Sequence, residues 1–185
     1  MKIPSHAKLV FQGVIFDVYQ WEQEMFDGTK EIFEAIKRPG TVQVIPTKGD
    51  KILLSFEEQP GKPRRITFLG GRMEKDEEPL AAAKRELLEE SGMESKNWEL
   101  YRSYQSGGKI EWPFYVYIAH DVQKVAKPHL DAGEKIDIKE VTFDEFIEII
   151  TSEDYIDRQI SEEIFRLKQD PIKFAEFKQK LFPTV

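Results

Sequence analysis

The segment 71–93 constrains this chain more than any other, because it concentrates acidic residues on a stretch with a clear helical period. Pro79 predicts the start of a helix and Gly92 its end, since proline suits a first helical turn and glycine suits the residue after the last one. A short apolar run over 66–69 precedes two glycines and predicts a strand. The resulting order of strand, glycine turn and helix is one in which functional sites are often built.

Three glutamates converge on the polar side of the predicted helix. At about 100° per residue, Glu86 and Glu90 lie about 40° apart and Glu89 lies beyond them. Like charges four residues apart destabilise an isolated helix by about 0.2–0.5 kcal/mol, unless a cation lies between them. A bound magnesium or manganese ion would offset this repulsion, and the glutamates would then form a metal-binding site. Arg85 and Glu89 can pair one turn apart on the same helix. The alternative interpretation of the glutamates is a solvated acidic helix face.

The composition limits which chemistry these carboxylates can support. A length of 185 residues with 40% hydrophobic residues fits one folded domain, and the absence of cysteine excludes thiolate zinc sites and a cysteine nucleophile. Any metal must then use oxygen ligands or the histidines His6, His120 and His129. A net charge of −7 with scattered basic residues argues against nucleic acid, and no apolar run is long enough to span a membrane. We therefore expect a cytoplasmic protein without a nucleic-acid or membrane partner.

Apolar alternation predicts further strands and helices on both sides of the acidic segment. The first two strands flank the Asp27-Gly28 turn and predict an N-terminal hairpin. The predicted strands cover 14–21, 31–36, 41–46, 51–56, 66–69, 98–105, 112–119 and 135–141, and the predicted helices cover 79–91, 144–151, 154–168 and a piece after Pro171. This order predicts one mixed α/β domain with a hairpin appendage.

The acidic segment resembles the Nudix box over its full length. The residues at the family's positions are Gly71, Glu77, Arg85, Glu86, Leu87, Glu89, Glu90, Gly92 and Met93. The resemblance implies an α/β/α sandwich around a mixed β-sheet and metal-dependent hydrolysis of a pyrophosphate bond. It also implies that residues 1–38 serve dimerisation and base binding, while residues 39–185 form the Nudix hydrolase domain.

The same resemblance implies a role for each box residue. Glu86 and Glu90 would be the principal ligands of Mg²⁺ or Mn²⁺, with the carbonyl of Gly70 as another. Glu89 would be a further ligand or a base for the attacking water, and Arg85 would orient the glutamates.

A late loop, 129–134, resembles the mobile acidic loop of one subgroup. Its Glu134 is the candidate general base, with Asp131 as a substitute and a solvated loop carboxylate as the alternative.

The flanking residues resemble the ADP-ribose pyrophosphatases within this family, which are homodimers whose N-terminal strands cross to complete the partner's site. The resemblance implies that Phe33 stacks on adenine, Glu34 bonds to the base edge and Arg38 meets a phosphate. The alternative interpretation makes Phe33 a core or interface aromatic residue and makes Glu34 and Arg38 surface charges.

The chain also departs from the pattern of that subgroup. Gln59 is followed by Pro60 instead of leading to a phosphate-binding arginine, so Arg64 or Arg65 is the candidate replacement. Leu69 and Gly107 stand where prolines are usual.

The favoured prediction is hydrolysis of ADP-ribose, or another ADP-sugar, to AMP and a sugar phosphate. The alternatives are the same chemistry on a GDP-sugar, a dinucleotide or FAD, and a non-catalytic nucleotide sensor. Hydrolysis of oxidised nucleoside triphosphates is disfavoured by the N-terminal hairpin.

Overall fold

Strand β4 (Thr41–Lys48) lies at the centre of the main sheet in this computed structural model, which describes residues 1–153, 155 and 157–183. The order across this sheet is β12 (Lys135–Val141), β5 (Lys51–Glu58), β4, β10 (Pro113–His120) and β8 (Asn97–Gln105), and β6 (Arg65–Thr67) pairs with β5. Strand β10 runs parallel to β4, whereas the other pairings are antiparallel. The sheet is therefore mixed, as the sequence predicts.

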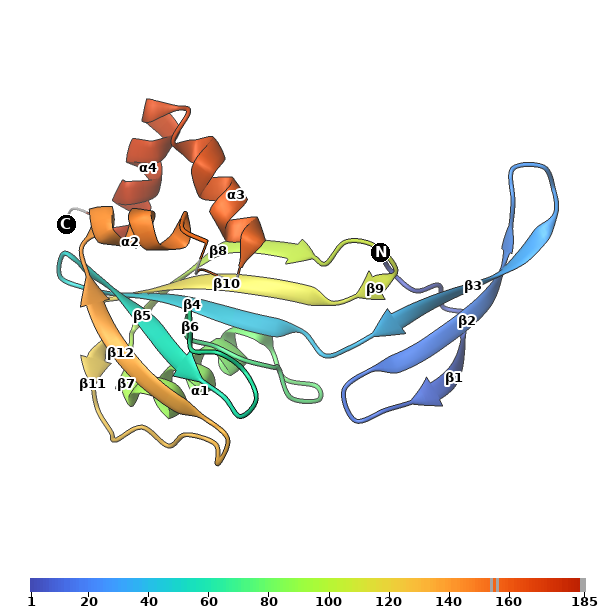
Figure 1. The fold of residues 1–185 in the computed structure, drawn as a ribbon, viewed down its shortest axis with the longest axis horizontal. Coiled ribbons are helices and arrows are strands. Elements are labelled where there is room, and N and C mark those ends of the chain that lie inside the picture. Colours follow the sequence, from blue (N-terminus) through green and yellow to red (C-terminus); the bar gives the residue numbers. More distant parts are fainter. Residues whose placement is uncertain (154, 156, 184–185) are drawn as a thin grey trace.

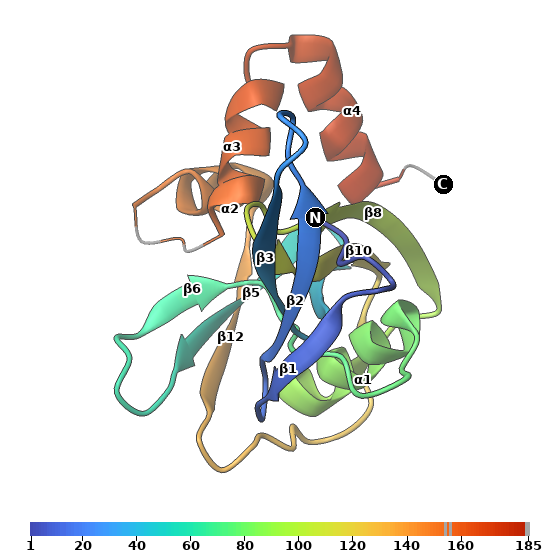
Figure 2. The ribbon, with the colours of Figure 1, turned by 90° about the vertical axis from the view of Figure 1, so that its right-hand side faces the viewer.

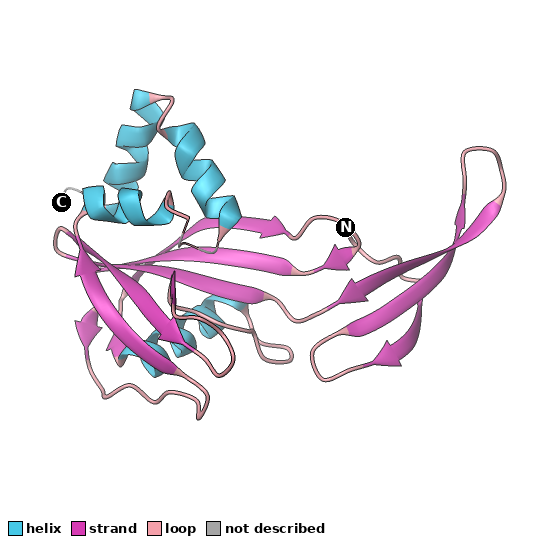
Figure 3. Ribbon diagram, viewed as in Figure 1, coloured by secondary structure: helices cyan, strands magenta, loops and turns pink. Residues whose placement is uncertain are grey.

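Helices cover both faces of this sheet (Figures 1 and 3). Helix α1 (Pro79–Ser91) packs on one face, and α2 (Phe143–Ile150), α3 (Arg158–Leu167) and α4 (Pro171–Leu181) lie on the other. Successive side chains of a strand point to opposite faces, so β10 directs Val116 and Ile118 to the core under α2 and Tyr117 and Ala119 to the core over α1. The predicted α/β/α sandwich is confirmed.

The N-terminal residues form a second sheet that extends away from the main one, and we call it the arm (Figure 1). Its strands, in order, are β1 (Lys8–Gln12), β2 (Asp17–Glu24), β3 (Lys30–Lys37) and the short β9 (Ile110–Glu111). Figure 2 shows β1, β2 and β3 in front of the main sheet when the arm faces the viewer. The predicted hairpin is present as β2 and β3, with a turn at Gly28 (φ 82°).

Several boundaries differ from the prediction for local reasons. Strand β2 begins at Asp17 because the Gly13 N–H donates to the Phe16 carbonyl (3.0 Å), which closes a turn where the sequence predicted strand. Helix α3 begins at Arg158 after its N-cap Asp157, and the predicted start at residue 154 lies outside the described residues. The segment between the predicted strands 112–119 and 135–141 contains β11 (Gln123–Lys124), which pairs with β7 (Met93–Glu94).

Candidate active site

The two glycines before α1 let backbone and carboxylates approach each other closely. Gly70 has a φ of 133°, and a Cβ there would lie 2.2 Å from the Val42 carbonyl oxygen. Its N–H donates to Glu90 Oε2 at 2.8 Å. A Cβ on Gly71 would lie 2.6 Å from Glu86 Oε1. Side chains at these two positions would therefore displace either the β4 backbone or the carboxylate.

Helix α1 presents one apolar side to the sheet and one acidic side to a cavity. Ala82, Ala83 and Leu87 are fully buried against the main sheet, which fixes the rotation of the helix. This rotation leaves the Glu86 side chain 13% exposed and the Glu89 side chain 44% exposed. Gly92, with a φ of 64°, ends the helix as predicted.

Arg85 connects the acidic residues of this site. Its Nη1 donates to Glu86 Oε1 and to Glu89 Oε2, both at 2.9 Å. Its Nε and Nη2 donate to the two Glu77 oxygens at 2.9 and 3.0 Å. Hydrogen bonding with Glu77 raises the pKa of Arg85, so the guanidinium stays charged. The predicted pairing of Arg85 with Glu89 is confirmed.

Burial disfavours the charged form of the inner carboxylates. Desolvation raises the pKa of Glu90 well above its ordinary value, against the opposing Gly70 hydrogen bond, and nearby Glu86 and Glu134 raise it further. Desolvation also raises the pKa of Glu86. A cation among these groups would remove most of this penalty.

Glu86, Glu89 and Glu90 open onto a cavity of about 820 Å³ between α1 and the loops around it. Gly70, Gly71, Arg38, Gln59 and Glu134 also line it. A second cavity, of about 440 Å³, shares Gly70, Gly71, Arg38, Glu90 and Glu134 with the first. The two hollows therefore meet at the glycine turn.

The loop 129–134 is tied to α1 at one end and carries the candidate base at the other. The His129 N–H donates to the Glu89 carbonyl at 2.8 Å, and the Glu134 N–H donates to the Asp131 carbonyl at 2.9 Å. Partial burial and the neighbouring Asp131 raise the pKa of Glu134. Both Glu134 and Asp131 line the larger cavity.

The donor set at this site fits a hard divalent cation. Carboxylate oxygens and a backbone carbonyl are the ligands that Mg²⁺ and Mn²⁺ prefer. Within the described part of the chain, no group of three acidic or histidine side chains is already arranged as a set of metal ligands. Glu90 bonds instead to the Gly70 N–H, and Glu86 bonds to Arg85.

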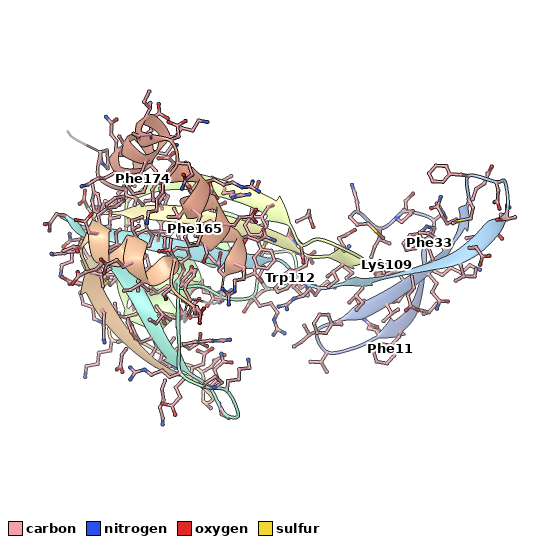
Figure 4. The ribbon with its side chains drawn as sticks, turned by 45° about the horizontal axis from the view of Figure 1, so that its top comes forward. Phe11, Phe33, Lys109, Trp112, Phe165 and Phe174 are labelled. Atoms are coloured by element: carbon pink, nitrogen blue, oxygen red, sulfur yellow. The ribbon has the colours of Figure 1, made fainter. Side chains whose placement is uncertain are left out.

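The three predicted substrate residues are divided between two places. Arg38 follows β3 and lines both cavities. Its Cζ lies 3.9 Å from the centre of the Trp112 ring. Figure 4 shows Trp112 at the junction of arm and main sheet. Burial lowers the pKa of Arg38, and its buried Nε has no hydrogen-bond partner among the described residues. Phe33 and Glu34 lie on the arm, and neither lines either cavity.

Phe33 and Glu34 have partners within the arm itself. The Phe33 ring lies 5.9 Å from that of Trp21, and Lys109 Nζ lies 5.1 Å from its centre (Figure 4). Gln20 donates to Glu34 Oε2 at 2.7 Å.

Three residues of the second cavity did not emerge from the sequence motifs as a group: Glu57, Arg65 and Trp112. They come from β5, β6 and the residue between β9 and β10, so no common spacing joins them. The one signal for Arg65 in the sequence was the missing arginine after Gln59, which made Arg64 or Arg65 the candidate phosphate-binding residue.

Among the described residues, no helix has both the length and the apolar character needed to cross a membrane.

Comparisons with known proteins give one family model and two curated relatives that cover most of the chain. A family model described as NUDIX domain matches residues 37–164. An ADP-ribose pyrophosphatase of Bacillus subtilis (strain 168) is 28% identical over 152 residues, covering 80% of this chain and 82% of that protein. A methanol dehydrogenase activator of Bacillus methanolicus is 28% identical over 145 residues, covering 76% and 78%.

A solved structure described as an ADP compounds hydrolase superposes with a TM-score of 0.72 at 16% identity. The superposition covers 89% of this chain and 91% of the chain of that structure, and it shows that the two share a fold.

Proposed function

Because this chain belongs to the Nudix family, whose model matches residues 37–164, we propose that it hydrolyses the pyrophosphate of ADP-ribose or another ADP-sugar to AMP and a sugar phosphate. The observation that carries the proposal is that Glu86, Glu89 and Glu90 share one cavity of about 820 Å³. The chain is a Nudix hydrolase, and members of this family act on small nucleoside diphosphate derivatives. The curated relative named as an ADP-ribose pyrophosphatase supports the choice of substrate.

Nudix hydrolases generally use a divalent metal, and we assign this one Mg²⁺ or Mn²⁺. Glu86, Glu90 and the Gly70 carbonyl would hold it, with Glu89 as a further ligand. When bound, such a cation neutralises charge on the pyrophosphate and makes a water molecule more acidic.

The protein's own groups then have distinct tasks. Arg85 positions the Glu86 and Glu89 carboxylates through its two hydrogen bonds. A Glu134 carboxylate oxygen accepts the proton of the attacking water, which forms a new P–O bond as the bridging P–O bond breaks. Arg38 meets a phosphate oxygen, and its buried, unpaired Nε supports this assignment. No covalent enzyme intermediate is needed.

Base recognition in this proposal requires a homodimer. Phe33 stacks on adenine and Glu34 bonds to the base edge, but both lie outside the cavities of their own chain. The arm exposes Leu9, Val10, Phe11 and Ile32 to solvent, and a second copy of the chain would cover these apolar side chains. Residues 1–38 would thus serve dimerisation and base binding, and residues 39–185 would form the hydrolase domain.

The test is a phosphate-release screen with Mg²⁺ and, separately, Mn²⁺. The panel contains ADP-ribose, ADP-glucose, GDP-mannose, NADH, FAD, diadenosine polyphosphates and nucleoside triphosphates, with a coupled phosphatase. Glu90→Gln is the control, because it keeps an oxygen acceptor for the Gly70 N–H but removes a charged ligand.

We expect ADP-ribose to react fastest and Glu90→Gln to lose about 100-fold or more in kcat. A GDP-sugar, a dinucleotide or FAD in first place would move the substrate to that class. If nothing on the panel reacts with either ion, the hydrolase proposal fails for these substrates, and a nucleotide-sensor role becomes the better explanation.

A further inference from the structure

The second cavity contains an ion pair that belongs to none of the box contacts. Strand β6 pairs with β5 so that Arg65 lies directly opposite Glu57, which places both side chains on the same face. Arg65 Nη2 donates to Glu57 Oε1 at 3.1 Å, and Arg65 Nε donates to Glu57 Oε2 at 3.3 Å. Glu57 is 8% exposed, while the Arg65 side chain keeps 26% of its surface exposed. The arginine is therefore the more accessible partner.

This pair faces the same hollow as the inner glutamates. Arg65 and Glu57 line the cavity of about 440 Å³ together with Glu90, Glu134 and Arg38. A substrate that reaches Glu90 through this cavity carries its diphosphate past Arg65. Arg38 and Arg65 then provide two cations on the approach to the acidic site.

The guanidinium retains donors for a ligand. It has five N–H groups in a planar fork that matches phosphate oxygens. Nε and Nη2 donate to Glu57, and among the described residues no group accepts a hydrogen bond from Nη1 of Arg65. Glu57 thus fixes the orientation of the fork and leaves one of its edges for another acceptor.

The neighbouring arginine has a different environment, although it is adjacent in sequence. Arg64 pairs with Asp137 at 2.5 Å, and its side chain is 52% exposed. It lines neither of the two cavities that Glu90 lines. Arg64 precedes the first residue of β6, and of the two arginines only Arg65 lines the second cavity.

We propose that Arg65 is a substrate-binding residue that donates to non-bridging oxygens of the diphosphate, and that buried Glu57 holds its guanidinium in place. This assignment rests on the proposed function, because it assumes a nucleoside diphosphate derivative as substrate. Arg65, the first residue of β6, would replace the arginine that the sequence lacks after Gln59.

The competing explanation is a structural one, in which Arg65 only neutralises a buried carboxylate. A double variant separates the two explanations, because Glu57→Gln removes the charge that needs neutralising. The variants are Arg65→Gln, Glu57→Gln with Arg65→Gln, and Arg64→Gln as a matched control. The probe is the α,β-methylene analogue of ADP with Mg²⁺, whose bridge is not hydrolysed. Calorimetric titration measures its binding, adenosine is the phosphate-free reference, and thermal unfolding is followed in parallel.

We expect Arg65→Gln to weaken binding of the analogue about tenfold or more, to leave adenosine binding unchanged and to lower the melting temperature. The double variant should regain the melting temperature but still bind the analogue weakly. Arg64→Gln should bind it within about twofold of wild type.

Two results would overturn the assignment while leaving the proposed function intact. One is wild-type affinity for the analogue in Arg65→Gln, and the other is recovery of that affinity in the double variant. If the wild-type protein binds neither the analogue nor adenosine, the proposed function fails and the role of Arg65 fails with it. If the analogue binds and depends on Arg65, but the substrate panel is inert, the binding site stands and hydrolysis does not.

Discussion

Glu90 combines burial, a backbone contact and like-charged neighbours in one side chain. Its Oε2 accepts the Gly70 N–H at 2.8 Å, yet desolvation keeps its pKa well above the ordinary range. Nearby Glu86 and Glu134 add to this effect. In the absence of a cation, the charged form of Glu90 opposes folding near neutral pH, and a ligand that neutralises it stabilises the protein.

The two glycines before α1 give a prediction at single positions. Gly71→Ala should reduce kcat by about 100-fold with little change in stability, because the new Cβ meets the movable Glu86 carboxylate at 2.6 Å. Gly70→Ala should instead destabilise the fold by about 1–3 kcal/mol or more, since its φ of 133° suits only glycine and its Cβ meets the β4 backbone.

Urea unfolding and steady-state kinetics on both variants measure these effects. Gly49→Ala is a control for the general cost of alanine at a positive φ, because a Cβ there meets nothing within 4 Å. A Gly71→Ala protein with wild-type kcat would show that the Glu86 position is unimportant for the reaction.

At the scale of elements, Glu77 connects the loop before α1 to Arg85 on that helix. Glu77 accepts two hydrogen bonds from Arg85, and this contact is the main reason that the pKa of Glu77 is lowered below 4.5. A lowered pKa in the folded state adds stability above the unfolded value, and this stability is lost as the pH falls through the folded pKa. Glu77→Gln should therefore cost about 1–3 kcal/mol at neutral pH and lose less stability on acidification from about pH 6 to about pH 3.

Chemical denaturation across this pH range tests the prediction. Glu78→Gln is the matched control, because Glu78 is adjacent, exposed and makes no side-chain cap bond to α1. An identical pH dependence in Glu77→Gln and wild type would mean that the Arg85 contact adds nothing to folding.

The sequence predicted the helices and strands whose apolar residues follow a regular pattern, and it missed the strands that lack one. The five main strands alternate or run apolar, and α1 has both end signals, so each was found within a few residues. All five residues of β1 are exposed, and β7, β9 and β11 have two residues each, so hydrophobic periodicity could not reveal them.

The residues of the candidate site also divide into those that the sequence predicted and those that it did not. Its box residues lie on one helix and the turn before it, where spacing along the chain determines geometry. Trp112, Glu57 and Arg65 reach the second cavity from separate segments, and the register of β5 with β6 is what pairs Glu57 with Arg65. Pairing between distant segments is not encoded in any local pattern.

At the scale of the whole molecule, the separation of Phe33 from the cavities predicts complementation between subunits. In the proposed function Glu90 is a metal ligand and Phe33 is the base-stacking ring, so Glu90→Gln would remove the first and Phe33→Ala the second. If the arm of one subunit completes the site of its partner, a mixed dimer contains one site with neither change. Mixing the two inactive variants should then restore about a quarter of wild-type activity after subunit exchange.

The control is a mixture of Glu90→Gln with a variant that carries both changes, which should stay inactive. Activity in the first mixture that equals the sum of its two components would show that each chain builds its site alone.

The contact between Arg38 and Trp112 has one more consequence. Arg38 lies between β3 and β4 and Trp112 lies between β9 and β10, where the arm meets the main sheet, and both line the second cavity. If Arg38 binds substrate as proposed, ligand preference and arm orientation would share these residues, and a change made for one would alter the other. Substitutions intended to change substrate choice here should be judged on quaternary structure as well as on kinetics.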